Sequence, residues 1–295
     1  MKVLITGASG FVGKALAGRL IAQGSEVIGI SRAPEKQEKI QGLTWTTLKK
    51  APECEVVIHL AGESILGIWT ESKKKKIYDS RVLGAKHLLN ALESWTVKPK
   101  TFISASAVGI YGDRGDEALT ENSDLDLQNG FLSKVCRAWE KESFQAEHIG
   151  ARVVRARFGL VMDPYDGMLG LQWPSFRAKV CLVPNRPEGY MPWISLHDLV
   201  SALIYLVEHK SIQGEVNLTA PVPVKMSEWV SVLDEHFNFG IKAFIPEFLL
   251  KPLGHDFVRE AYSSQKAIPQ RLLESGFQFH DSTWREYVAS LFNTK

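Results

Sequence analysis

A glycine-rich segment near the start of the chain constrains the fold more than any other feature. It runs Thr6-Gly7-Ala8-Ser9-Gly10-Phe11-Val12-Gly13, directly after the apolar run Val3-Leu4-Ile5, and it leads into an amphipathic run from Phe11 to Ile21. A strand, a glycine turn and a helix in this order form the setting that a dinucleotide-binding turn requires. The segment therefore predicts a strand-turn-helix unit whose helix N-terminus faces a pyrophosphate.

Each glycine of this turn has its own reason to lack a side chain. Gly7 allows the tight exit from the strand, Gly10 lets the backbone approach the phosphates, and Gly13 lets the helix pack closely on the strand. The predicted cofactor-binding residues of the turn are Gly7, Ser9, Gly10, Phe11, Val12 and Gly13.

Composition narrows the class of protein. The 295 residues suit one large or two modest domains, and a net charge of +2 gives no reason to expect nucleic acid or an anionic membrane as a partner. No apolar run approaches the roughly 20 residues of a membrane span. Cys54, Cys136 and Cys181 form no Cys-x-x-Cys pair, and the eight histidines show no metal-ligand spacing. We therefore expect a cytoplasmic monomer or homodimer without a metal site, acting on a small molecule.

The first half of the chain alternates short apolar runs with helical runs, which is typical of an α/β protein with a doubly wound parallel sheet. The expected strands are 3–5, 26–30, 56–60, 101–105 and 152–157, and the expected helices are 11–23, 70–94 and 130–148. After about residue 164 prolines, glycines and tryptophans gather. Helical runs then follow at 196–208, 227–238 and 264–275, with an extended run at 214–219.

This change in composition and pattern predicts that the chain folds into two structural units. Residues 1–163 form a Rossmann-type nucleotide-binding domain, and residues 164–295 form a smaller mixed α/β portion that covers the ends of the strands, with some segments returning to the sheet.

The end of the second expected strand indicates which dinucleotide binds. An acidic residue there selects NAD, whereas an arginine favours the 2′-phosphate of NADP. The strand ends in Ile30-Ser31-Arg32, and no acidic residue follows until Glu35. Ser31 can donate a hydrogen bond to a phosphate and Arg32 can bind it with paired N–H groups, so NADP(H) is favoured over NAD(H).

Motifs along the whole chain resemble the extended short-chain dehydrogenase/reductases, and among them the group called epimerase family proteins, which has its own C-terminal domain. The motifs are Gly7–Gly13, Leu60-Ala61-Gly62-Glu63, Trp69-Thr70, Ser80-Arg81, Ser104–Gly112, Trp139-Glu140, Pro192–Leu199, Val216–Pro221 and Gln265–Leu272. The resemblance implies a Rossmann-type domain and a nicotinamide cofactor, usually NADP. It also implies that Leu60, Ala61, Gly62, Glu63 and Arg81 lie at that cofactor, whereas the position of Arg81 on an expected helix near Asp79 suits a surface ion pair equally well.

The superfamily's chemistry uses a Ser, a Tyr and a Lys, with Tyr and Lys four residues apart on one helix face. Ser106 fits the Ser position, although Ser104 lies on the same strand face. Lys134 fits the Lys position, where it would contact the nicotinamide ribose. The residue four positions earlier is Gly130, so the usual Tyr is absent. Tyr111 is the nearest phenol in sequence, either as a replacement or as a packing residue.

Several other polar and aromatic residues are weaker candidates. Those for proton transfer are Glu63, Tyr165, Tyr190 and His197, the last of which also suits a helix cap with Asp198. Trp173, Arg177, Tyr190 and Trp193 either cover the nicotinamide or, for the two tryptophans, pack between the domains. The chain is therefore predicted to be an NADP(H)-dependent oxidoreductase or epimerase-like enzyme. The alternative is a catalytically silent NADP(H)-binding protein.

Overall fold

A seven-stranded parallel sheet forms the centre of the computed structural model, which describes residues 1–32, 40–125 and 130–293. The strand order is β12-β7-β5-β4-β1-β2-β3, and every neighbouring pair is parallel. The strands are β1 (Lys2–Thr6), β2 (Glu26–Ile30), β3 (Gln41–Leu43), β4 (Val56–His59), β5 (Thr101–Ala107), β7 (Arg152–Phe158) and β12 (Gly214–Leu218). The order reverses between β1 and β4, which is where ligands bind in such sheets.

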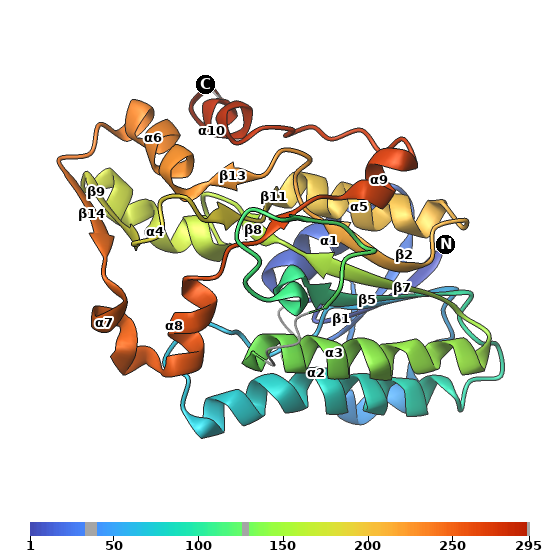
Figure 1. The fold of residues 1–295 in the computed structure, drawn as a ribbon. Coiled ribbons are helices and arrows are strands. Elements are labelled where there is room, and N and C mark those ends of the chain that lie inside the picture. The colour runs from blue at the N-terminus through green and yellow to red at the C-terminus, as the bar shows by residue number, and fades with distance from the viewer. Residues whose placement is uncertain (33–39, 126–129, 294–295) are drawn as a thin grey trace.

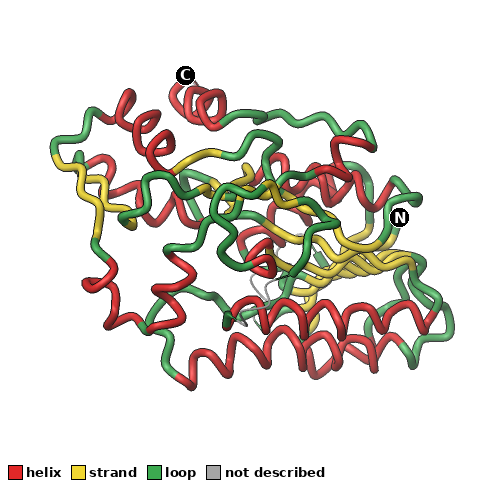
Figure 2. The backbone as a smooth tube through the Cα atoms, in the orientation of Figure 1, coloured by secondary structure: helices red, strands yellow, loops and turns green. Residues whose placement is uncertain are grey.

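Helices cover both faces of the sheet, so the fold is the doubly wound α/β arrangement that the alternating pattern predicts. Helices α1 (Phe11–Ala22) and α5 (Leu196–Glu208) lie over one face, and α2 (Glu71–Leu92) and α3 (Phe131–Phe144) lie over the other (Figure 1, Figure 2). Short 3-10 segments follow two strands and one helix. They are η2 (Trp45–Lys50) after β3, η3 (Val108–Tyr111) after β5 and η4 (Gln145–Ile149) after α3.

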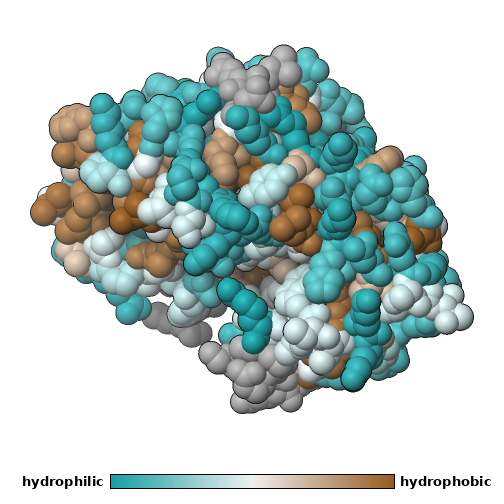
Figure 3. Space-filling model, turned by 90° about the horizontal axis from the view of Figure 1, so that it is seen from below, coloured by the Kyte–Doolittle hydropathy of each residue, from teal (hydrophilic) through white to brown (hydrophobic). Residues whose placement is uncertain are grey.

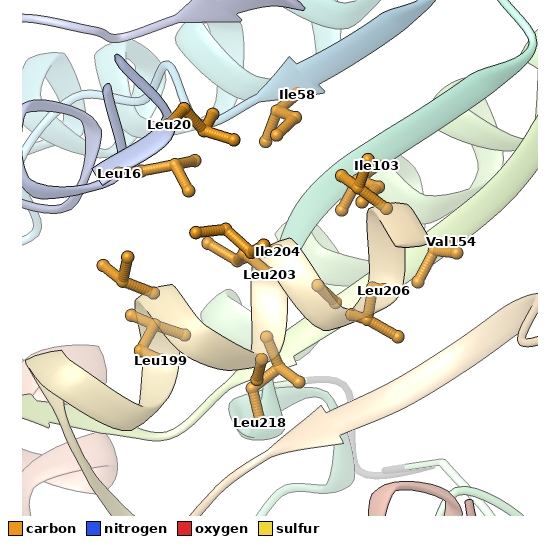
Figure 4. Packing of buried hydrophobic residues seen from close by; sticks show 14 of the residues in the cluster. Leu16, Leu20, Ile58, Ile103, Val154, Leu199, Leu203, Ile204, Leu206 and Leu218 are labelled. Carbon is orange, nitrogen blue, oxygen red and sulfur yellow. The ribbon is translucent and has the colours of Figure 1, made fainter. Parts of the chain in front are cut away.

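Apolar side chains of α5 hold this helix on the sheet (Figure 4). Leu203 and Leu206 lie in one buried cluster with Ile103 of β5 and Val154 of β7, and Leu16 of α1 belongs to the same cluster. Each fully buried leucine contributes about 1.5–3 kcal/mol relative to an exposed one. The cluster therefore joins residues 196–208, which follow the expected boundary at 163, to the nucleotide-binding half.

The C-terminal portion is built from short strand pairs and helices around its own core. The pairs are β8 (Leu160–Met162) with β11 (Trp193–Ser195), β9 (Val180–Pro184) with β14 (Ile241–Ile245), β10 (Tyr190–Met191) with β13 (Val224–Lys225), and β6 (Ala118–Leu119) with β15 (Lys266–Ala267). The helices are α4 (Gly167–Arg177), α6 (Met226–Phe237), α7 (Glu247–Leu250), η5 (Lys251–Leu253), α8 (His255–Ala261), α9 (Gln270–Glu274) and α10 (Trp284–Asn293). Trp193, Trp229 and Trp284 are buried together in its centre.

The expected elements of the first half agree with the structure to within a few residues, and α5 has the expected bounds. The expected helix at 264–275 is wrong, because this segment begins with β15 and only α9 is helical. Helix α4 was hidden from pattern analysis because Pro174 lies inside it and Gly170 is part of it. The extended run at 214–219 is β12, which returns to the main sheet beside β7.

The surface differs between the two ends of the molecule. Figure 3 shows hydrophobic side chains gathered at the end formed by β9, β14 and α7, where Ile241, Phe248 and Leu249 are exposed. Among the described residues, no helix combines the length and the apolar character that crossing a bilayer would need.

Candidate functional site

A groove of about 380 Å³ opens where β1, β2 and β4 end, at the reversal point of the sheet. Its lining residues are Gly7, Ser9, Gly10, Ser31, Arg32, Trp45, Leu60, Ala61, Gly62, Glu63, Ser80, Leu83, Gly84 and His87. Most of the predicted cofactor-binding residues are therefore brought together by the fold. Those that do not line the groove are Phe11, Val12, Gly13, Arg81 and Lys134.

Tight packing of the glycine turn explains two of its glycines. Gly7 has a φ of +75°, and a Cβ there would lie 3.0 Å from the backbone of Leu60 and Ala61. A Cβ on Gly13 would lie 2.2 Å from the Gly7 carbonyl oxygen, which no side chain can tolerate. Gly10 differs, because its φ of −79° suits any residue and its Cβ would meet only the Gly7 oxygen, at 3.1 Å. Gly7 and Gly13 thus shape the turn, whereas Gly10 keeps space open in the groove.

The N-terminus of α1 is electrostatically prepared for an anion. Gly10 is its N-cap, no side chain caps it, and its first turn holds no acidic residue. Uncapped N–H groups and the positive end of the helix dipole together attract phosphate. Phe11 and Val12 are the first two residues of this helix, so their backbone N–H groups have no acceptor within the helix.

Ser31 and Arg32 lie at the end of β2, on the edge of the groove. Ser31 is buried, and within the described ranges, which leave out residues 33–39, its Oγ has no hydrogen-bond partner. The Arg32 side chain is 84% exposed and reaches Glu63 at 3.4 Å, while Lys73 of α2 binds the other oxygen of Glu63 at 2.9 Å. The hydrogen bond from Lys73 is the main cause of a lowered pKa at Glu63, which therefore stays ionised. The Ser31 hydroxyl thus lacks an acceptor, and the exposed Arg32 guanidinium beside it has N–H groups left over from its contact with Glu63.

Arg81 holds the loop that follows β4 from behind. Its guanidinium donates to the carbonyl oxygens of Glu63 at 3.0 Å and Ile77 at 3.2 Å, and it lies over the ring of Trp139. A Cβ on Gly62 would come within 3.1 Å of this guanidinium. Burial lowers the pKa of Arg81. Arg81 therefore supports the backbone of the groove wall and does not itself line the groove.

His59 ties the ends of β1 and β4 together beneath the groove. Burial lowers its pKa to about 3, so the ring is neutral. Its Nδ1 lies 2.6 Å from the Thr6 hydroxyl oxygen, and that oxygen accepts a hydrogen bond from the Ala61 amide at 3.2 Å. The hydrogen bond between His59 Nδ1 and the Thr6 hydroxyl completes this chain, which fixes Ala61 against Gly7.

The sequence pattern missed one wall of the groove. Trp45 of η2 and His87 of α2 stand there with ring centroids 5.8 Å apart, and Ser80, Leu83 and Gly84 of α2 complete the wall. The Ser80-Arg81 motif was a signal for this part of α2. No motif surrounds Trp45.

Ser106 belongs to a buried polar network. Its Oγ donates to Glu140 at 2.7 Å, and Glu140 forms a two-pronged ion pair with Arg157, both bonds being 2.9 Å. Burial alone would lower the pKa of Arg157, but the hydrogen bonds and charge of Glu140 outweigh it and raise that pKa. The Ser106 hydroxyl is thus occupied within the protein. Ser104, the other serine of this strand face, accepts from Ser143 at 2.7 Å.

Tyr111 lies in the same network and has no exposed surface. Its hydroxyl accepts from Arg157 at 2.9 Å and donates to the Asn217 side chain at 2.8 Å. Burial is the main cause of its raised pKa. Tyr111 therefore packs in the protein interior and does not line the groove. This position agrees with a packing role and not with a role as the replacement for the missing tyrosine.

Lys134 does not meet the other two predicted catalytic residues. It is exposed, whereas the buried face of α3 carries Cys136, Trp139 and Glu140. Gly130 is the N-cap that precedes α3 and not a residue of its first turn. The Lys134 amide still donates to the Gly130 carbonyl oxygen at 3.0 Å, so the two positions keep the predicted i, i+4 relation. Gly130 offers no phenol, however, and the Tyr111 hydroxyl is held by Arg157 and Asn217.

The weaker candidates are dispersed as well. Trp193 is buried against Trp284 at a ring distance of 5.3 Å, and Trp173 packs on Phe237 at 5.1 Å, so both tryptophans belong to the C-terminal core. The remaining candidates lie at the surface or half-buried, and none lines the groove: Tyr165, Arg177, Tyr190 and His197. The N-cap of α5 is Ser195, not the pair His197–Asp198.

Comparison with known proteins agrees with this architecture. The family model described as the NAD dependent epimerase/dehydratase family matches residues 3–218, and a domain of unknown function, DUF1731, matches residues 245–291. The epimerase family protein YfhF of Bacillus subtilis is 34% identical over 286 residues, covering 95% of this chain and 94% of the relative. The epimerase family protein ML0860 of Mycobacterium leprae is 33% identical, with 97% and 94% covered.

Solved structures show the same likeness over the full length. The crystal structure of human epimerase family protein SDR39U1 with NADPH superposes with a TM-score of 0.89 at 26% identity, covering 100% of both chains. The UDP-glucose 4-epimerase of Thermus thermophilus, solved in complex with NAD, shares the fold with a TM-score of 0.75 at 19% identity, again covering 100% of both chains. This chain belongs to the NAD dependent epimerase/dehydratase family and, within it, to the group of epimerase family proteins.

Proposed function

We propose that this chain binds NADP(H) in the groove and acts as an oxidoreductase or epimerase-like enzyme on a small molecule. The observation that carries the proposal is the unpartnered, buried hydroxyl of Ser31 beside the exposed guanidinium of Arg32. A 2′-phosphate would accept from the Ser31 hydroxyl, which has no acceptor among the described residues, and from the N–H groups that Arg32 does not use on Glu63. The NADPH bound by the human relative supports this assignment.

Each part of the groove suits one part of the cofactor. The uncapped start of α1 suits the pyrophosphate, Ser31 and Arg32 suit the 2′-phosphate, and the small residues Ala61 and Gly62 leave room for a ribose. When bound, the nicotinamide supplies or accepts a hydride. The chain's own residues position it, with Arg81 and His59 holding the wall behind Gly62 and Ala61.

The alternative function is that of a catalytically silent protein that binds NADP(H). The state of the predicted catalytic residues favours it. Ser106 and Tyr111 are engaged in the buried network, Lys134 is exposed, and Gly130 stands where a tyrosine is usual. A protein that binds cofactor and transfers no proton needs none of these groups at the groove. Three free, buried cysteines fit the cytoplasmic location that we propose for either function.

Arg32→Ala is expected to weaken NADPH binding by about tenfold to a hundredfold and to leave NADH binding nearly unchanged. One charge-assisted hydrogen bond contributes about 1.5–3 kcal/mol, and only NADPH carries the phosphate that receives it. Titration calorimetry with both cofactors measures the two ratios. Arg32→Lys keeps the charge without the paired N–H groups, so its NADPH affinity should lie between those of the unmodified protein and Arg32→Ala. An equal loss for NADPH and NADH would overturn the phosphate assignment.

Ser106→Ala separates the enzyme from the silent binder. If Ser106 leaves Glu140 to bind a substrate oxygen, its loss should lower kcat about tenfold to a thousandfold without changing the NADPH affinity. NADPH oxidation is followed at 340 nm (a general property of the reduced cofactor) against a panel of carbonyl compounds and nucleotide sugars. Turnover by the unmodified protein on any of them excludes the silent function. No turnover on the whole panel, with NADPH bound, contradicts the enzyme proposal for those substrate classes.

A further inference from the structure

Two histidines that are far apart in the sequence meet outside the groove. His197 is the second residue of α5, and His280 lies in the loop between α9 and α10, with the two ring centroids 4.7 Å apart. Asp281 completes the cluster, because one candidate ligand atom from each of the three residues lies within 4.8 Å of the others. None of the three residues lines the groove.

Asp198 fixes the backbone of this cluster. Its side chain is 1% exposed, and its two oxygens accept hydrogen bonds from the amides of His280 at 2.9 Å and Asp281 at 2.8 Å. Its own amide is held by the Ser195 hydroxyl at 3.1 Å. The loop that carries His280 is therefore bound to the start of α5, so the separation of the two imidazoles is set by fixed backbone.

Each imidazole has a carboxylate at its Nδ1. His280 Nδ1 lies 3.0 Å from Asp281, and His197 Nδ1 lies 3.4 Å from Asp198. Metal-binding histidines almost always donate one ring N–H to a carboxylate or carbonyl and coordinate the metal with the other nitrogen, which is the arrangement of His197 with Asp198. Asp281 is itself a candidate ligand, so it would leave His280 Nδ1 when it binds the ion. In the part of the chain that the structure describes, neither Nε2 has a hydrogen-bond partner, so each can offer its lone pair to a cation.

The charge around the cluster is also suited to a cation. Asp198 and Asp281 are both buried. Among the described residues, their ion-pair partners are the two imidazoles. No lysine or arginine within the described ranges forms an ion pair with either carboxylate. A divalent ion would offset this local negative charge.

We propose that His197, His280 and Asp281 bind a divalent transition-metal ion, best matched by Zn²⁺. Two imidazoles and a carboxylate form a typical ligand set for zinc, and three protein ligands leave a fourth position for water. Bond lengths of about 2.0–2.1 Å place ligand atoms about 3.3 Å apart around a tetrahedral ion. The atoms must therefore close by about 1.5 Å, which side chains that are 49% exposed at His197 and 63% exposed at His280 can do by rotation.

The site would join the two halves of the chain. His197 begins α5, which packs on the main sheet, whereas residues 280–281 lead into α10, which packs in the C-terminal core. Zn²⁺ bound only by the folded protein stabilises it by mass action. At a hundredfold excess over Kd we expect the unfolding temperature to rise by about 5 °C.

The metal-free full-length protein is titrated with ZnCl₂ by calorimetry and with CoCl₂ by visible absorption, where tetrahedral Co²⁺ gives an intense band. We expect one equivalent of either ion. His280→Ala and His197→Ala should each weaken binding at least about tenfold and remove the thermal shift. Asp281→Asn tests the carboxylate with little change of shape, and His148→Ala, an exposed histidine elsewhere on the surface, is the matched control.

We expect weaker metal binding in all three cluster variants and unchanged metal binding in His148→Ala. The NADPH affinity should be the same in all four variants. Absence of stoichiometric binding by the unmodified protein at 0.1 mM metal (on the order of the weakest useful site) would overturn the proposal. Equal binding in His280→Ala and the unmodified protein would overturn it as well, because the ion would then lie elsewhere. Both outcomes leave the proposed cofactor function untouched.

Discussion

Gly10→Val should abolish detectable dinucleotide binding, with a loss of at least about a hundredfold, or about 2.7 kcal/mol. The valine side chain would project from the N-cap of α1 into the groove, where the pyrophosphate must approach the helix N-terminus. The protein should remain folded. The φ of −79° at Gly10 suits valine, and the added Cβ meets only the Gly7 oxygen at 3.1 Å.

Two other glycines supply the controls. Gly18→Val lies on the same helix with open space around it, so it should leave cofactor binding unchanged. Gly13→Ala should instead destabilise the fold, because its Cβ would lie 2.2 Å from a carbonyl oxygen. Circular dichroism reports folding and calorimetry reports binding. A folded Gly10→Val protein with unchanged NADPH affinity would contradict the assignment of the groove.

Arg157→Met should destabilise the protein by about 3–5 kcal/mol, because it leaves the buried carboxylate of Glu140 without a counter-charge. Arg157 is 2% exposed and also donates to Tyr111, which loses that hydrogen bond. Urea unfolding measures the loss. Adding Glu140→Leu to this variant should recover part of it, since a buried ion pair replaced by apolar side chains is often tolerated.

The same strand offers a matched control for this prediction. Arg155 lies two residues earlier on β7 and pairs with Glu215 at 2.7 Å, but both side chains are partly exposed. Arg155→Met should cost about 1 kcal/mol or less, as expected for an ion pair in contact with solvent. Equal losses for the two variants would show that the network around Ser106 and Tyr111 does not hold the site together.

Local patterns predicted the groove well because its residues follow strands directly. Gly7, Ser31 and Leu60 come next to β1, β2 and β4, and parallel strands bring their ends to one edge of the sheet. A motif that follows a strand directly therefore also shows where its residues lie in the fold. Trp45 lacked such an anchor, because η2 follows β3 without a motif that marks it.

The surroundings of the candidate catalytic residues were harder to predict. The burial and orientation of a side chain depend on segments that are distant in the sequence. Tyr111 is close to Ser106 in sequence, but its hydroxyl is held by Arg157 of β7 and Asn217 of β12, which only the assembled sheet brings near. Gly130 and Lys134 do have the expected helical spacing, since the Lys134 amide donates to the Gly130 carbonyl oxygen at 3.0 Å, but this spacing does not supply the missing phenol. His197 and His280 meet only because the C-terminal portion folds back on α5, so spacing alone gave no metal-ligand pattern.

Calorimetric titration of the unmodified protein with NADPH and with NADH tests the central claim most directly. We predict one equivalent of NADPH per chain, bound about tenfold to a hundredfold more tightly than NADH, because we propose that Ser31 and Arg32 bind the 2′-phosphate that NADH lacks. Failure to bind either cofactor, or tighter binding of NADH than of NADPH, would contradict the account.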